Sequence, residues 1–184
     1  MPVGALLLLN GTPGIGKSTV ARRLCDGRRL SLCLDIDMLR RSLGQWMDHP
    51  ERSGALARDL ALAAAERHLR GGHGVVVPQF LGRLDFVERL EELAETVGAP
   101  FDHVVLMDDE ASATSRFLGR VHAADATDQH REAAAMAGGE AGFGEMDRAL
   151  HAVAEVRTVW VVASVENDVD GTLASVRAAV SGRW

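Results

Sequence analysis

Near its start the chain carries eight residues with the types and spacing of a phosphate-binding loop. The pattern G-x-x-x-x-G-K-[ST] is matched at every position by Gly11, Thr12, Pro13, Gly14, Ile15, Gly16, Lys17 and Ser18, and Thr19 comes next. Such glycines let backbone N–H groups turn inward around phosphate oxygens, at the start of the following helix. Lys17 supplies a positive charge for the β- and γ-phosphates, and the Ser18 hydroxyl is a ligand for Mg²⁺. We therefore expect Gly11–Thr19 to bind a nucleoside triphosphate; a chance match in a glycine-rich turn is the alternative.

Two aspartates follow a second apolar run and are candidates for metal binding and proton transfer. Asp35 and Asp37 are two positions apart, so they face the same side if the chain stays extended. Because ligands bind beyond the carboxyl ends of parallel strands, this position lies near the phosphate loop. We assign Asp35 to the Mg²⁺ shell and Asp37 to the hydroxyl that attacks the phosphate. Asp37 as a simple helix cap is the alternative. Asp108 and Asp109 are a second-ranked pair for the metal.

Three arginines and an amide are further candidates for the same site. Arg40 follows Asp37 by about one helical turn, where a solvated helix position is the alternative. Gln79 follows the third apolar run. Its amide suggests that the molecule that receives the phosphoryl group, the acceptor, is neutral at this point and forms hydrogen bonds. Arg116 and Arg120 are four positions apart, on one face of a helix. Such arginines neutralise charge on a moving phosphoryl group, and a solvated surface pair is the alternative.

Apolar runs alternate with helical patterns along the chain. Strands are expected near Ala5–Leu9, Leu30–Leu34, Val75–Val77, Val104–Met107 and Val159–Ala163. Helices are expected at about Lys17–Asp26, Asp37–Trp46, Ala55–Arg70, Leu84–Val97, Glu110–Ala123 and Asp170–Val180. This alternation predicts a single α/β domain over residues 1–184, with a parallel sheet covered by helices on both faces.

One stretch, from about residue 124 to 145, does not follow the alternation. It contains four glycines between positions 138 and 144, which predict a flexible hinge or loop. A long insertion in a compact domain is either an active-site lid or a disordered segment. We therefore expect a lid over about residues 116–147.

The composition excludes several classes of protein. The net charge of −6 disfavours nucleic acid as the main partner, because proteins that grip phosphate backbones are usually basic. No apolar run approaches the roughly 20 residues that a membrane span needs. Cys25 and Cys33 fit no metal site or disulfide framework and are expected to be reduced. Without a targeting signal, the expected location is the cytoplasm.

The phosphate loop, followed about twenty residues later by Asp35-Ile36-Asp37-Met38-Leu39-Arg40, resembles P-loop kinases that phosphorylate hydroxyl groups of small molecules. The nearest patterns are those of chloramphenicol phosphotransferase, shikimate and gluconate kinases, and the kinase domain of phage polynucleotide kinase. The resemblance is specific over residues 3–43. It implies a three-layer P-loop NTPase fold with a five-stranded parallel sheet of order 2-3-1-4-5, a mobile lid, and ATP with Mg²⁺.

The same resemblance implies roles for individual residues. Asp37 corresponds to the carboxylate that contacts the acceptor hydroxyl, and Asp35 to one that acts through the magnesium shell. Arg40 matches an arginine near the acceptor, and Arg116 or Arg120 an arginine that enters the lid. The leading hypothesis is an ATP-dependent kinase for a hydroxyl of a small molecule, such as an antibiotic, sugar acid or nucleoside. A 5′-hydroxyl polynucleotide kinase and an NTP-binding regulatory module or slow ATPase are the alternatives.

Overall fold

The structure, a computed structural model, describes residues 3–108, 139–180 and 183–184. In this part of the chain five parallel strands form one sheet of order β2-β3-β1-β4-β5, as expected. The strands are β1 (Leu6–Gly11), β2 (Leu32–Cys33), β3 (Val75–Pro78), β4 (Phe101–Met107) and β5 (Trp160–Ala163). The helices are α1 (Lys17–Asp26), α2 (Ile36–Arg41), α3 (Pro50–Arg70), α4 (Leu84–Val97), α7 (Gly139–Val156) and α8 (Val169–Ala179).

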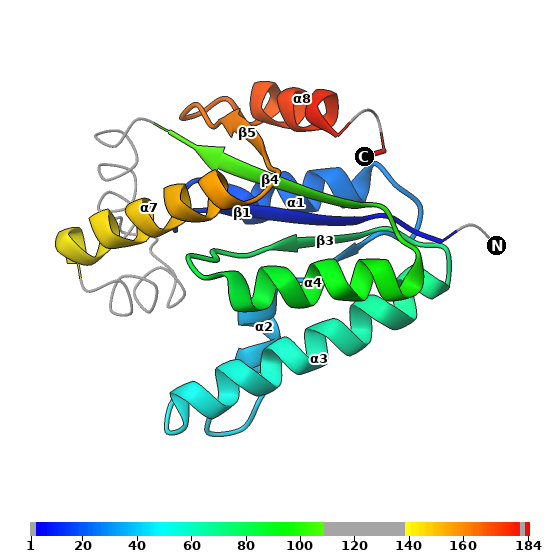
Figure 1. The fold of residues 1–184 in the computed structure, drawn as a ribbon, viewed down its shortest axis with the longest axis horizontal. Helices are drawn as coiled ribbons and strands as arrows, with labels where there is room; N and C mark the ends of the chain where they lie inside the picture. Colours follow the sequence, from blue (N-terminus) through cyan, green and yellow to red (C-terminus); the bar gives the residue numbers. More distant parts are fainter. Residues whose placement is uncertain (1–2, 109–138, 181–182) are drawn as a thin grey trace.

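Helices cover both faces of the sheet, and β1 divides its side chains between them (Figure 1). Leu6 and Leu8 are fully buried on the face that α3 and α4 cover. Leu7 and Leu9 are fully buried on the opposite face, against α1 and α8. Because successive residues of a strand point to opposite faces, a continuous apolar run is what a strand at the centre of such a sheet requires.

Two helices begin where the sequence did not place them. The helix expected from Ala55 starts at Pro50, because proline fits the first helical position, where no N–H donor is needed. The glycine-rich segment predicted as a loop to about residue 145 belongs to α7 from Gly139 onward. Its helix is stabilised by packing, since Phe143, Leu150 and Val153 are buried on one face. The helix expected over 110–123 lies outside the described residues.

Two other elements are shorter than expected. The second strand contains only Leu32 and Cys33, because Leu30 adopts a left-handed backbone conformation with φ of 57°. The following helix, α2, ends at Arg41 rather than at Trp46. Among the described helices, none combines the length and apolar character needed to cross a bilayer.

The C-terminal residues are fastened to the sheet. Arg183 donates two hydrogen bonds to the buried carboxylate of Asp102, of 2.9 Å from Nε and 2.6 Å from Nη2. The ring of Trp184 is buried against Gly74, and the Arg28 guanidinium lies 5.4 Å from its centroid. The end of the chain therefore contributes to the same core as β1.

Candidate functional site

The phosphate-binding loop leaves the end of β1 and enters α1, as its motif predicts. Gly16 adopts a left-handed conformation with φ of 101° at the N-cap of α1. A Cβ at Gly11 would lie 2.9 Å from a methyl of Ile15 and 3.0 Å from the carbonyl oxygen of Leu106, so only glycine fits there. The Lys17 ammonium folds over the loop and donates to the carbonyl of Thr12 at 2.9 Å. The loop thus has the backbone geometry of a phosphate cradle.

Buried polar side chains that the sequence analysis did not single out support this loop. Asn10 is fully buried, and its Oδ1 accepts from the N–H of Gly11 at 2.8 Å and of Leu81 at 2.9 Å. Its Nδ2 donates to the Leu81 carbonyl at 3.0 Å and lies 3.4 Å from Nε2 of His103. Ser164, just after β5, donates to the Ile15 carbonyl at 2.8 Å. Side chains therefore connect the loop to the β3–α4 connection and to the residue after β5.

His103, in β4, is buried next to the Asn10 side chain. Burial lowers the pKa of its imidazole to about 4, and the positive charge of Arg157 acts in the same direction. Its Nδ1 is buried and has no hydrogen-bond partner among the described residues. The ring is consequently neutral at physiological pH.

Asp35 caps the helix that carries Asp37. Its Oδ1 accepts from the backbone N–H of Asp37 at 3.0 Å and of Met38 at 3.2 Å. The capping role considered for Asp37 therefore belongs to Asp35, the N-cap residue of α2. Asp37 occupies the first turn of that helix, with its side chain available for other contacts.

The surroundings of Asp37 bring three predicted site residues together. Water reaches its side chain, yet protein atoms surround it closely enough that burial raises the pKa of its carboxyl. The neighbouring negative charge of Asp35 raises this pKa further. Lys17 and Arg41, through their positive charges, and Gln79, through a hydrogen bond, lower it. Asp37 thus lies within electrostatic reach of the phosphate loop, as the sequence predicts.

Gln79 is positioned by the sheet. Its backbone N–H donates to the Leu9 carbonyl at 3.2 Å, which holds the residue directly after β3 beside β1. Its side chain lies close enough to the Asp37 carboxyl to lower the pKa of that group. Its Oε1 is buried and accepts no hydrogen bond from the described residues. An unsatisfied buried acceptor beside a carboxylate suits a ligand that brings its own donor, such as a hydroxyl.

The contacts of Arg40 join α2 to the start of α3. Its Nε donates to the Ser53 hydroxyl at 3.0 Å and its Nη2 to the Pro50 carbonyl at 2.8 Å. Its guanidinium lies 5.1 Å from the ring centroid of Trp46. These contacts have a positioning role, and a contact between Arg40 and the acceptor stays a prediction. Arg116 and Arg120 lie outside the described residues.

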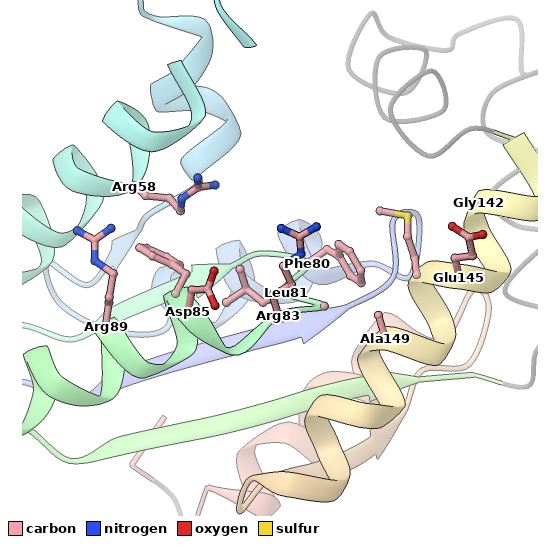
Figure 2. A pocket seen from close by; sticks show the side chains of 12 residues that line it. Arg58, Phe80, Leu81, Arg83, Asp85, Arg89, Gly142, Glu145 and Ala149 are labelled. Carbon is pink, nitrogen blue, oxygen red and sulfur yellow. The ribbon is translucent and has the colours of Figure 1, made fainter. Parts of the chain in front are cut away.

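A cleft of about 790 Å³ opens beside the loop that follows β3 (Figure 2). It is bounded by α3, by the β3–α4 connection and the first turns of α4, and by α7. Its lining residues are Arg58, Phe80, Leu81, Gly82, Arg83, Asp85, Phe86, Arg89, Gly142, Glu145, Met146 and Ala149. This volume is within the range of small-molecule sites.

Comparison with known proteins places this geometry in a family. The family described as AAA domain matches residues 6–141, which include the phosphate loop, the aspartate pair and Gln79. An adenylate kinase from Synechococcus sp. (strain CC9902) is 33% identical over 132 residues, which are 66% of this chain and 72% of that enzyme. The chain belongs to the AAA-domain family of P-loop kinases.

Solved structures share the P-loop kinase fold over nearly the whole chain. The Mycobacterium tuberculosis APS kinase in complex with AMPPNP and APS has a TM-score of 0.63 at 18% identity and covers 98% of this chain and 99% of its own. A gluconokinase from Sinorhizobium meliloti 1021 has a TM-score of 0.58 at 19% identity, covering 98% and 97%. At these identities the likeness concerns the fold alone, and it does not extend to the acceptor.

Proposed function

We propose that the protein is an ATP-dependent kinase that transfers the γ-phosphoryl group of ATP to a hydroxyl group of a small molecule. The proposal rests above all on the position of Asp37. A carboxyl group with a raised pKa lies within the electrostatic influence of Lys17 and Gln79, and the buried Oε1 of Gln79 has no partner among the described residues. A loop that only bound or hydrolysed nucleotide would have no need of this arrangement for an acceptor.

In the proposed reaction, this chain's residues handle the proton and the charge. The acceptor hydroxyl donates its proton to Asp37, and a second donor group of the acceptor bonds to the Oε1 of Gln79. Its oxygen forms a bond to the γ-phosphorus while the bond from that phosphorus to the β–γ bridging oxygen breaks, and Asp37 takes the proton. Lys17 and the loop N–H groups stabilise the negative charge on the phosphates. A raised pKa makes Asp37 a better proton acceptor than an ordinary aspartate.

The oxygen atoms of Ser18 and Asp35 are of the kind that Mg²⁺ prefers as ligands. Magnesium in kinases takes one or two protein oxygens, and phosphates and waters complete its shell. Ser18 in the first turn of α1 supplies a hydroxyl, and Asp35 uses only Oδ1 to cap α2 in the contacts described above. When bound, the ion neutralises phosphate charge. We assign Ser18 and Asp35 to this role.

The test is transfer of a labelled γ-phosphate to a panel of hydroxylated metabolites, antibiotics and a 5′-hydroxyl oligonucleotide, with products identified by mass spectrometry. We expect wild type to label a small molecule. Asp37→Asn should lose at least about a hundredfold in kcat, the scale of general base catalysis, and keep its affinity for ATP.

The matched control is Asp48→Asn, an exposed aspartate on the connection that follows α2. It should leave transfer unchanged. ATP hydrolysis as the only activity across the whole panel, equal in wild type and Asp37→Asn, would refute the kinase and favour a regulatory module or slow ATPase. Labelling of the oligonucleotide alone would favour a polynucleotide kinase.

A further inference from the structure

Asn10 lies between the phosphate loop and the segment that carries Gln79. Its Oδ1 accepts two hydrogen bonds at once, from the N–H of Gly11 at 2.8 Å and from the N–H of Leu81 at 2.9 Å. Gly11 is the first residue of the loop that binds the nucleotide phosphates in the proposed function, and Leu81 follows Gln79 by two positions. One oxygen of a fully buried side chain therefore joins the nucleotide side of the site to the acceptor side.

The Asn10 amide pairs with the peptide groups of Leu81 as a neighbouring strand would. The Leu81 N–H donates to Oδ1, and Nδ2 donates to the Leu81 carbonyl at 3.0 Å. The register of β1 and β3 ends with the pair of Leu9 and Pro78, and the Gln79 N–H then donates to the Leu9 carbonyl at 3.2 Å. Beyond this point the Asn10 side chain replaces the backbone as the partner, so the chain stays beside β1 as far as Leu81.

These contacts fix the chain on either side of the Gln79 side chain. The bond to Leu9 fixes the backbone N–H of Gln79, and the two bonds to Asn10 fix the peptide groups two positions later. Residues 79–83 belong to no helix or strand, and Figure 2 shows Leu81 on this connection where it borders the cleft. Without Asn10, the segment would keep only its bond to Leu9, and the Gln79 amide would be free to shift relative to Asp37.

The chemistry of the amide suits this place. Oδ1 accepts from two N–H groups and Nδ2 donates to a carbonyl, so the partners fix which way the amide faces. Nδ2 also lies 3.4 Å from Nε2 of His103, whose ring burial keeps neutral. A leucine of the same shape would leave three buried backbone groups without a partner. An aspartate would place a second oxygen against the Leu81 carbonyl.

We propose that Asn10 is a positioning residue of the transfer reaction, which through Leu81 holds the Gln79 amide at a fixed place relative to the phosphate loop. This inference rests on the proposed function and adds a residue to it. A nucleotide bound to the loop restrains Gly11, and the shared oxygen of Asn10 then restrains Leu81 as well. Nucleotide binding therefore orders the acceptor side of the site before the acceptor arrives.

The first test needs no acceptor. Hydrogen exchange of the Leu81 N–H is followed by NMR in the full chain, without nucleotide and with saturating AMPPNP and Mg²⁺. In wild type we expect the nucleotide to slow this exchange by at least about threefold. In Asn10→Ala the exchange should be at least about tenfold faster, the effect of one hydrogen bond, and should not respond to AMPPNP. Ser164→Ala, which removes the bond to the Ile15 carbonyl of the same loop, should keep the response at Leu81.

The second test is a double-mutant cycle, measured as kcat for the acceptor that the labelled-phosphate panel identifies. Asn10→Ala should lower kcat by at least about tenfold, since a misplacement of about 1 Å at a reaction site costs up to about a hundredfold. In a Gln79→Leu background the same substitution should lower kcat by less than about threefold, because the amide that Asn10 positions is already absent. A purely structural role would give the same loss in both backgrounds. Ser164→Ala and Gln79→Leu should multiply their separate effects.

The inference is overturned if AMPPNP leaves the exchange of Leu81 in wild type unchanged, if Asn10→Ala keeps the wild-type response, or if its loss of kcat is the same with and without Gln79. The measurement on wild type decides even where Asn10→Ala does not fold. These outcomes are separate from the fate of the kinase proposal. A response at Leu81 without transfer to any acceptor supports the link through Asn10 and rejects the kinase. Transfer without that response supports the kinase and rejects the link.

Discussion

Asn10→Ala is expected to lower the free energy of unfolding by about 3–5 kcal/mol, a large share of the roughly 5–15 kcal/mol of a typical domain. The Asn10 side chain satisfies three backbone groups, the N–H of Gly11 and the N–H and carbonyl of Leu81. Each buried group left without a partner costs about 1–3 kcal/mol. The lower part of the summed range applies, because a water can enter the space that the amide leaves.

The measurement is equilibrium unfolding in urea, followed through the fluorescence of the three tryptophans. Ser164→Ala is the matched control, because it removes the hydrogen bond to the Ile15 carbonyl of the same loop. It should cost about 1 kcal/mol. A loss below about 1 kcal/mol for Asn10→Ala, or one no larger than for Ser164→Ala, would show that Asn10 does not hold the loop to the β3–α4 connection.

Four other variants test the titratable groups described above. Since the pKa of His103 falls from 6.5 in the unfolded chain to about 4 in the folded one, stability should be constant above pH 6.5 and decline by about 3 kcal/mol as the pH falls to 4. His103→Gln should remove this part of the decline in urea titrations at pH 7 and 4.5, and an unchanged decline would contradict the assignment. Gln79→Leu removes a hydrogen bond that lowers the pKa of Asp37, so the acid limb of the kcat/KM profile should move to higher pH. A limb that stays in place or moves to lower pH would speak against this contact. Arg183→Ala leaves the buried Asp102 carboxylate without its ion-pair partner. It should lower the free energy of unfolding by about 3 kcal/mol, measured by thermal or urea unfolding. Asp102→Asn leaves Arg183 in contact with water and should cost about 1 kcal/mol; the opposite order would refute the burial argument.

The elements that the sequence predicts best carry signals at both ends. The helix α1 runs over Lys17–Asp26 as expected, since the phosphate motif marks its start and Gly27 follows its end. The helix α4 also matches its prediction, because its apolar stripe is regular and Gly98 in a left-handed conformation terminates it. The strand order follows from the family resemblance, and the sheet confirms it.

The elements that differ are those in which local signals and packing disagree. In α7 the glycines favour a loop by propensity, but burial of Phe143, Leu150 and Val153 gains more than the glycines lose. The sequence did contain a signal for the start of α3, namely Pro50 ahead of a helical pattern.

The supporting residues of the site could not be read from the sequence, because their partners are distant. Asn10 and Leu81 are 71 positions apart, and Ser164 and Ile15 are 149. Asn10 also comes directly after the leucine run, where its only signal is that an amide separates the leucines from the motif. The cleft likewise requires α3, α4 and α7 to be placed before Arg58 and Arg83 can be seen to share it.

The hydrogen bond from Ser164 to the Ile15 carbonyl has a consequence for how the protein is made. On the ribosome, Ser164 follows Ile15 by 149 positions, so the loop emerges long before the serine that secures it. Truncated products that stop before β5 lack this bond and the strand that carries it. Translation products that stop before β5 should therefore hold the phosphate loop less firmly than chains that include Ser164.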